Sequence, residues 1–180
     1  MLNKACFAIL PLLLAFQHAI APAAQDQGFG GPGQARLAQE VRHQLLMLPY
    51  YNVFDNLEFR VEGRDVVLTG QVTRPVVKED AESAVRSIPG VETVTNDIEV
   101  LPVSPFDDQI RRAAYRAIYG NPALRRYALN PNPPIRIIVK NGNITLAGVV
   151  DSEIDKTLAG MQANSVPDVF SVTNNLRVEG

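Results

Sequence analysis

Arginine and tyrosine side chains are concentrated in one stretch of this 180-residue chain. Residues 107–140 carry seven basic and two acidic residues, whereas residues 34–103 carry seven and eleven, and residues 141–180 carry two and five. Guanidinium groups bind phosphate oxygens, and phenol rings suit the headgroup region of a bilayer. The pattern indicates binding to an anionic phospholipid membrane surface by Arg111, Arg112, Tyr115, Arg116, Tyr119, Arg125, Arg126 and Tyr127.

An amphipathic helix that begins after Ser104 would position the first five of these side chains. Ser104 can cap the helix, Pro105 suits its first turn, and Asp107 closes a capping box. At about 100° per residue, the arginines and tyrosines of this helix oppose an apolar arc. That arc consists of Ile110, Ala113, Ala114, Ala117 and Ile118. We therefore expect the basic and aromatic side chains to share the solvent face.

The sequence shows no catalytic or metal-binding pattern elsewhere. His43 is the only histidine after residue 24, and Cys6 is the only cysteine. Ser83, Ser87 and Ser165 have no base near them in sequence. No glycine-rich loop leads from an expected strand into an expected helix in the pattern that holds phosphates. We therefore expect no enzyme activity, no cofactor and no metal site.

The N-terminal residues have the features of a secretory leader. Residues 1–4 are basic, residues 5–16 are apolar, and residues 21–23 have the small-x-small pattern that signal peptidase reads. We predict a cleaved signal peptide over residues 1–24, a flexible glycine-rich linker over residues 25–33, and a periplasmic protein peripheral to the membrane. Nucleic acid is not an expected partner, because a secreted acidic protein seldom meets it.

The remainder of the chain contains the same pattern twice. Residues 57–100 align without a gap on residues 135–178, and 13 of these 44 positions are identical. Such a match indicates two copies of one small domain. We predict the first domain over residues 34–103 and the second over residues 104–180.

Each copy is predicted to fold as helix, strand, strand, helix, strand. In the first copy, residues 37–48 have helical periodicity, residues 57–61 and 66–72 alternate as a hairpin, and a second helix spans residues 75–87. A last strand ends at residue 100, and the crossover helix makes it a parallel neighbour of the second strand. We expect an α+β fold in which each three-stranded mixed sheet packs on two helices. The second copy has a tight turn at Asn141-Gly142 and five extra residues within 123–134.

Four repeated residues are expected to have structural roles. Gly70 and Gly148 lie on the apolar face of the second strand, where a missing side chain would let a helix approach closely. Asn96 and Asn174 lie between apolar neighbours on the third strand. Their amides, if buried, must form hydrogen bonds with nearby backbone.

The repeated residues form a valine and glycine skeleton. In the first copy it comprises Val66, Leu68, Gly70 and Val72, then a helix, then Val91, Val94, Asn96 and Ile98; residues 144–150 and 169–176 repeat it. This skeleton resembles the BON domain. A leader followed by two such domains is similar to the OsmY-like and DolP-like periplasmic proteins. The resemblance implies an envelope protein that binds phospholipid or protects the membrane without catalysis. Lipid-anchored members carry a cysteine at the cleavage site, and this chain has none there.

These observations favour a protein that binds anionic phospholipid reversibly and supports envelope integrity or osmotic stress tolerance. Two alternatives remain open. In one, the chain is a protein-interaction module or a chaperone-like protein at an outer-membrane complex, with envelope proteins as partners. In the other, Tyr115 or Tyr119 packs against the first copy, whose acidic residues neutralise the basic helix. We expect contact between the two domains in either case.

Overall fold

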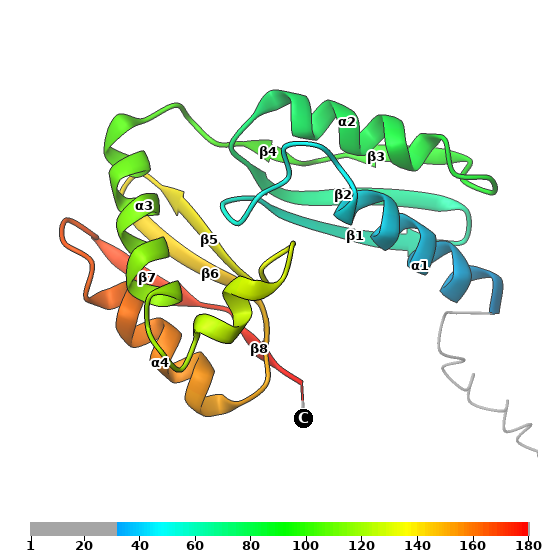
Figure 1. Cartoon of the computed structure of the whole chain (residues 1–180). Helices are drawn as coiled ribbons and strands as arrows, with labels where there is room; N and C mark the ends of the chain where they lie inside the picture. Colours follow the sequence, from blue (N-terminus) through cyan, green and yellow to red (C-terminus); the bar gives the residue numbers. More distant parts are fainter. Residues whose placement is uncertain (1–31, 180) are drawn as a thin grey trace, which may run out of the picture.

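The computed structural model describes residues 32–179, so the expected signal peptide, Cys6 and most of the expected linker lie outside the described residues. Two α+β units follow one another (Figure 1). Copy 1 consists of α1 (Pro32–Leu46), β1 (Asn56–Glu62), β2 (Asp65–Val72), α2 (Pro75–Arg86), β3 (Thr93–Asn96) and β4 (Glu99–Val100). Copy 2 consists of α3 (Pro105–Tyr119), the 3-10 helix η1 (Arg125–Leu129), β5 (Ile135–Lys140), β6 (Asn143–Val150), α4 (Glu153–Asn164), β7 (Ser171–Asn174) and β8 (Arg177–Val178).

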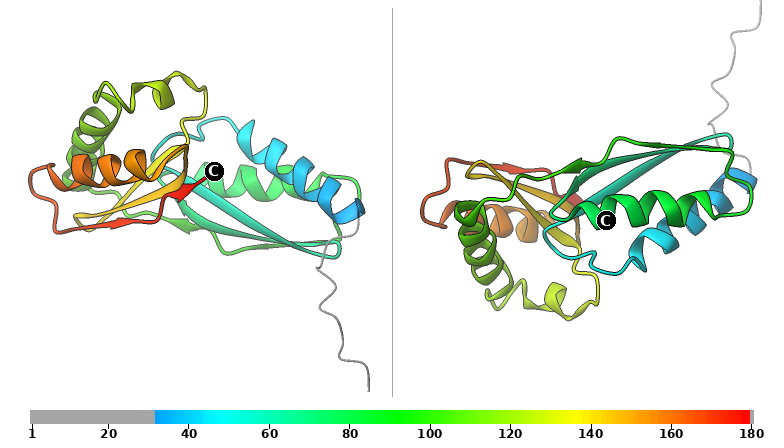
Figure 2. Two further views of the ribbon diagram at one scale, coloured as in Figure 1. Left: turned by 90° about the horizontal axis from the view of Figure 1, so that it is seen from below. Right: turned by 90° about the horizontal axis from the view of Figure 1, so that it is seen from above.

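The sheet topology confirms the predicted α+β fold of both copies. β1 pairs antiparallel with β2, and β2 pairs in parallel with both β3 and β4. β5, β6, β7 and β8 repeat this arrangement. The predicted third strand is therefore present in each copy but is interrupted into two short segments. The two helices of each copy pack on its sheet (Figure 2).

Each copy has its own apolar core between helices and sheet. In copy 1, Val41 and Leu45 of α1 meet Val66 and Leu68 of β2 and Val77 of α2. The core of copy 2 is built in the same way, but it also contains Val53 and packs against Phe54, both from copy 1. The two units are therefore joined through side chains as well as through the short linker at residues 101–104.

The interruption of the third strand has a side-chain cause. Asn96 donates from Nδ2 to the carbonyl oxygen of Lys78 at 3.0 Å, and its Oδ1 accepts the Ile98 N–H at 3.3 Å. Asn174 does the same with Lys156 at 2.7 Å and Leu176 at 3.3 Å. The expected hydrogen bonds to backbone are therefore present, and they tie the interrupted strand to the second helix of its copy.

The expectation that Gly70 and Gly148 admit a helix is wrong. Their φ angles are +113° and +109°, in a region that L side chains rarely adopt. A Cβ on Gly70 would lie 2.0 Å from the Asn56 carbonyl oxygen, and one on Gly148 would lie 1.9 Å from that of Pro134. Both acceptors lie at the start of the neighbouring strand. The glycines therefore allow a kink against β1 or β5, not a helix contact.

The N-terminus of α3 agrees with the sequence except at one residue. Ser104 Oγ accepts the Asp107 N–H at 3.2 Å, as a cap should. The Asp107 carboxylate does not close the capping box, because it is buried and accepts the N–H groups of Asn141 at 3.0 Å and Gly142 at 2.8 Å. Those two residues have the positive φ angles of the expected tight turn, 50° and 76°. Asp107 therefore joins α3 to the hairpin.

Candidate functional site

A loop of copy 1 covers the edge of the sheet in copy 2. The Val53 carbonyl oxygen accepts the N–H of Ile137 in β5 at 2.9 Å. The Arg136 guanidinium lies over the Tyr51 ring, 4.4 Å from its centroid, and donates to the Asn52 carbonyl oxygen at 3.1 Å. The expected contact between the two domains is therefore present, and it supplies an edge strand with an added hydrogen bond.

The loop is held in this shape by a buried carboxylate. Asp55 is fully buried and accepts the N–H of Asn52 at 3.0 Å, together with the N–H and hydroxyl of Thr73 at 2.6 and 2.8 Å. Charge-assisted hydrogen bonds of this kind are stronger than neutral ones. The loop that reaches copy 2 is therefore fastened at its base to the end of β2. Sequence reasoning missed this residue, because nothing local distinguishes Asp55 from the exposed acids around it.

Three of the eight predicted lipid-binding residues are buried. Arg111 is 5% exposed, and Tyr119 and Tyr127 are each 4% exposed, so the expectation that they face solvent is wrong. Arg111 donates to the Val139 carbonyl oxygen at 2.7 Å and to Asp108 at 2.5 Å. Tyr119 donates to the Ile135 carbonyl oxygen at 2.6 Å, and burial raises the pKa of its phenol. Both side chains lie at the flank of α3, where they cover β5.

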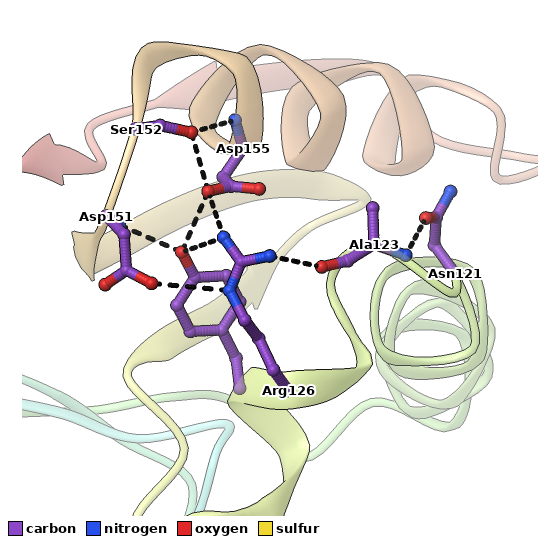
Figure 3. Close-up of polar contacts among 7 residues, drawn as sticks. Asn121, Ala123, Arg126, Asp151, Ser152 and Asp155 are labelled. Atoms are coloured by element: carbon purple, nitrogen blue, oxygen red, sulfur yellow. Dashed lines mark hydrogen bonds and ion pairs between the residues drawn. The ribbon is translucent and has the colours of Figure 1, made fainter.

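Tyr127 and Arg126 belong to a polar network at the start of α4, in which Figure 3 labels Arg126, Asp151, Ser152 and Asp155. The Asp155 carboxylate accepts from Arg126 at 2.5 Å, Tyr127 at 3.0 Å and Ser152 at 2.7 Å. The Tyr127 hydroxyl accepts the Asp151 N–H at 2.9 Å. Burial raises the pKa of Tyr127, whereas for Asp155 the hydrogen bonds from Ser152 and Tyr127 and the charge of Arg126 outweigh burial and lower the pKa. This network fixes η1 against α4.

The remaining predicted residues stay on the surface of copy 2. Arg112, Arg116 and Arg125 are exposed, and none has an ion-pair partner among residues 32–179. Tyr115 is 38% exposed, and its ring lies edge-on to Phe54 of copy 1 with 6.3 Å between centroids. The alternative in which a tyrosine packs against the first copy therefore holds for Tyr115. We call Arg112, Tyr115, Arg116 and Arg125 the basic face.

A cleft of about 650 Å³ opens between the two copies beside the basic face. Copy 1 contributes Tyr50, Tyr51 and Arg74, and copy 2 contributes Arg111 and Arg112. Arg74 and Tyr50 were not identified from the sequence, because they come from separate loops that only the folded chain brings together.

Exposed apolar side chains occur on α4. Ile154 is 78% exposed and Met161 is 62% exposed. The matching positions of α2, 78 residues earlier, hold Val76 and Ser83. The exposed side of α4 is therefore more apolar at these two positions than the matching side of α2.

Two further features of the described chain bear on its function. Among the helices within residues 32–179, none combines the length and the hydropathy that crossing a bilayer requires. The same residues bring no three His, Cys, Asp or Glu side chains together in a group that could hold a metal ion.

Comparisons with known proteins identify the family of the repeated unit. The BON domain pattern matches residues 34–102 and again residues 107–180. No curated protein sequence matches this chain. Among solved structures, the C-terminal domain of CdsD, a structural protein of the type III secretion system of Chlamydia trachomatis, aligns with 80% of this chain and 98% of that chain at 10% identity and a TM-score of 0.28. A second CdsD structure aligns with 80% of this chain and 92% of that chain, at 12% identity and a TM-score of 0.29. Scores this low carry no argument about function.

The two family matches cover nearly all of the described residues. BON domains are modules of envelope-associated, periplasmic proteins that interact with membranes or with other proteins, and they point to a non-catalytic role. This chain, with one such domain in each copy, belongs to the BON domain family.

Proposed function

We propose that the protein binds anionic phospholipid surfaces reversibly through the basic face of copy 2, and that it thereby supports envelope integrity or osmotic stress tolerance. The single observation that carries this proposal is the exposure of Arg112, Arg116 and Arg125 without ion-pair partners among the described residues. An arginine already paired with a carboxylate would lose that partner on binding phosphate. These three have no such partner to lose.

The expected strength of this interaction is modest. Each basic residue near an anionic membrane contributes about 1 kcal/mol. Three of them raise the affinity by roughly a hundredfold. Such binding is reversible and sensitive to salt, as suits a peripheral protein.

Apolar insertion falls mainly to α4 in this proposal. Tyr119 and Tyr127 are buried, and Tyr115 is partly covered by Phe54, so the tyrosines present little surface to a bilayer. Ile154 and Met161 lie on the exposed side of α4, which packs on the same sheet as α3 (Figure 1). Fully burying an aliphatic side chain contributes about 1.5–3 kcal/mol, so each of these two side chains contributes less than that when it inserts only shallowly.

Vesicle flotation tests the proposal. The triple variant Arg112→Gln, Arg116→Gln, Arg125→Gln should lose at least tenfold of its affinity for vesicles of phosphatidylglycerol and phosphatidylethanolamine. The matched control is Arg60→Gln, Arg64→Gln, Arg86→Gln, which removes the same charge from exposed copy 1 arginines that already pair with Glu62, Glu92 and Glu82. Equal loss in both triples, or equal binding to vesicles of phosphatidylcholine, would reject the proposal.

A protein-interaction role is the second candidate. Met47, Tyr50 and Leu129 are exposed apolar side chains, and the chain turn at Leu46 is tied to the η1 region by a 3.0 Å hydrogen bond from Asn132. These residues give the junction between the copies an apolar surface that lipid binding does not require. Chemical crosslinking to envelope proteins that is lost in Met47→Ser, Leu129→Ser but kept in both arginine triples would favour this candidate.

A further inference from the structure

We propose that the cleft between the two copies, which shares Arg112 with the basic face, is a binding site for a small molecule that carries a phosphate group. This proposal does not rest on membrane binding, because the ligand is soluble and copy 1 forms part of the wall of the cleft. The cleft volume of about 650 Å³ lies in the range of small-molecule sites.

The positive charge of the cleft comes from both copies. Arg74 precedes α2; its guanidinium lies over the Tyr50 ring, 5.5 Å from the centroid, and has no ion-pair partner among residues 32–179. Arg112 faces the same cleft from α3, without an ion pair among those residues. Two guanidinium groups that line the same cleft from different copies can bind different oxygens of one phosphate group.

A third arginine adds charge from behind the wall. Arg111 lines the cleft and is nearly fully buried, and its Nε has no hydrogen-bond partner in the described part of the chain. Its other nitrogens bind one carboxylate, Asp108, and one carbonyl oxygen. A guanidinium neutralised by a single exposed partner leaves a positive field in the adjacent space, because the buried surroundings screen it poorly.

The acidic groups around the cleft do not cancel this field. Asp108 lines the cleft and is paired with Arg111, and Asp55 accepts two hydrogen bonds from Thr73. The charge of Glu58 also acts on Tyr51. Against these three carboxylates stand the three arginines of the walls and Arg136, which lies over Tyr51. The balance favours an anion.

The aromatic residues of the wall indicate the size of the ligand. Tyr50, Tyr51 and Phe54 provide an apolar side next to the arginines. Tyr51 is partly buried, and its pKa is raised by burial against the opposing charge of Arg136, so its phenol stays neutral at neutral pH. A phosphate with a small organic substituent fits both parts of this surface, whereas inorganic phosphate would use only the charged part.

Isothermal titration calorimetry on the chain without residues 1–24 tests the site, with glycerol 3-phosphate and inorganic phosphate at constant ionic strength. We expect saturable binding of both, at least tenfold weaker in Arg74→Gln. Arg60→Gln is the matched control, because Arg60 is an exposed arginine of copy 1 that does not line the cleft, and its variant should bind normally. Arg74→Lys, which keeps the charge, should restore part of the affinity.

The relative affinities for glycerol 3-phosphate and inorganic phosphate distinguish the two possible sources of the phosphate group. Tighter binding of glycerol 3-phosphate assigns the site to a headgroup-like ester, and equal binding assigns it to free phosphate. Vesicle flotation separates the site from the basic face: Arg74→Gln should float normally, and Arg116→Gln, Arg125→Gln should bind the soluble phosphates normally while floating less. Absence of saturable binding, equal loss in Arg60→Gln, or loss of flotation in Arg74→Gln would overturn the proposal.

Discussion

At the scale of single residues, Asp155 shows how copy 2 departs from its duplicate. Its carboxylate accepts hydrogen bonds from Arg126, Tyr127 and Ser152, whereas the matching position of copy 1 is Val77, which lies in the core. One acidic residue therefore replaces an apolar contact with a network that holds the inserted η1.

Asp155→Asn should lower the free energy of unfolding at pH 7 by roughly 1–3 kcal/mol, because it weakens buried hydrogen bonds to a charged group. The native interactions lower the pKa of Asp155 below its ordinary value of 3.8, so their stabilisation is present above pH 3.8 and is lost as the pH falls through the native pKa. Urea unfolding should therefore show a gap between wild type and variant that narrows below pH 3.8.

The control for this measurement is Asp151→Asn. The Asp151 side chain is 70% exposed and pairs with Arg126 at 3.3 Å, so the loss of its charge should change stability little. The wild type and Asp155→Asn differ in free energy of unfolding. If that difference at pH 3 agreed with the difference at pH 7 to within about 0.3 kcal/mol, the ionised carboxylate would have no role in stability.

Gly148→Ala should be among the most damaging small substitutions in the chain. The added Cβ would lie 1.9 Å from the Pro134 carbonyl oxygen, at a φ of +109° that alanine rarely adopts. We expect a loss of about 3 kcal/mol or more in thermal or urea unfolding. Gly33→Ala, at a helical position with open space around it, should be neutral or stabilising by about 0.5–1 kcal/mol. Similar effects of the two substitutions would refute the kink that we assign to Gly148.

At the scale of elements, β1 and β5 occupy the same place in their copies and differ in exposure. β5 is buried at every residue from Ile135 to Val139, whereas β1 alternates between half-buried and exposed residues. The sequence carries a sign of this difference, because Arg60 of β1 is matched by Ile138 of β5. α3 packs on β5, and the loop of copy 1 covers its edge. That loop has no recognisable periodicity.

Val53→Ala should destabilise copy 2 although Val53 belongs to copy 1. The loss of apolar burial costs about 1.5 kcal/mol, and it falls in the core that contains Ile135 and Ile137. Hydrogen exchange should be faster for the β5 amides, Ile137 above all, and unchanged for β2. Val66→Ala, in the core of copy 1, should speed hydrogen exchange of the β2 amides and leave that of the β5 amides unchanged. Exchange that quickens in copy 1 alone after Val53→Ala would show that the loop does not support copy 2.

At the scale of the whole molecule, the uneven charge gives the protein a direction. Residues 34–103 have four more acidic than basic residues, and residues 107–140 have five more basic than acidic residues. Near an anionic surface, copy 1 is repelled and residues 107–140 of copy 2 are attracted, although residues 141–180 have three more acidic than basic residues. We therefore expect the basic face to point toward the membrane and copy 1 to point away from it.

Binding to anionic vesicles should weaken steeply with salt. The Debye length falls from about 10 Å at 0.1 M salt to about 3 Å at 1 M, which removes most of the attraction between exposed arginines and headgroups. Sedimentation with vesicles between these salt concentrations should show a loss of at least tenfold. Binding that is unchanged by salt would assign the interaction to Ile154, Met161 and other apolar side chains, contrary to our proposal.

The repeated α+β fold could be predicted from the sequence, because helices, hairpins and cores are encoded by apolar periodicity within each copy. Asn96 and Asn174 were assigned their hydrogen bonds correctly for the same reason, since helix and strand were already placed. The candidate site was predicted only in part. Arg112, Arg116 and Arg125 are exposed as expected, whereas Arg111, Tyr119 and Tyr127 have partners within copy 2.

A helical wheel shows which residues share a face of one helix, but exposure depends on what packs against that face. Besides Asp108, Arg111 binds the Val139 carbonyl oxygen, 28 residues further along the chain, and Arg136 binds the Asn52 carbonyl oxygen, 84 residues back in the other copy. No local pattern reports contacts at such separations. The duplicated domains are thus a property of the amino-acid order, whereas the extent of the basic face and the existence of the cleft follow from how the two domains pack together.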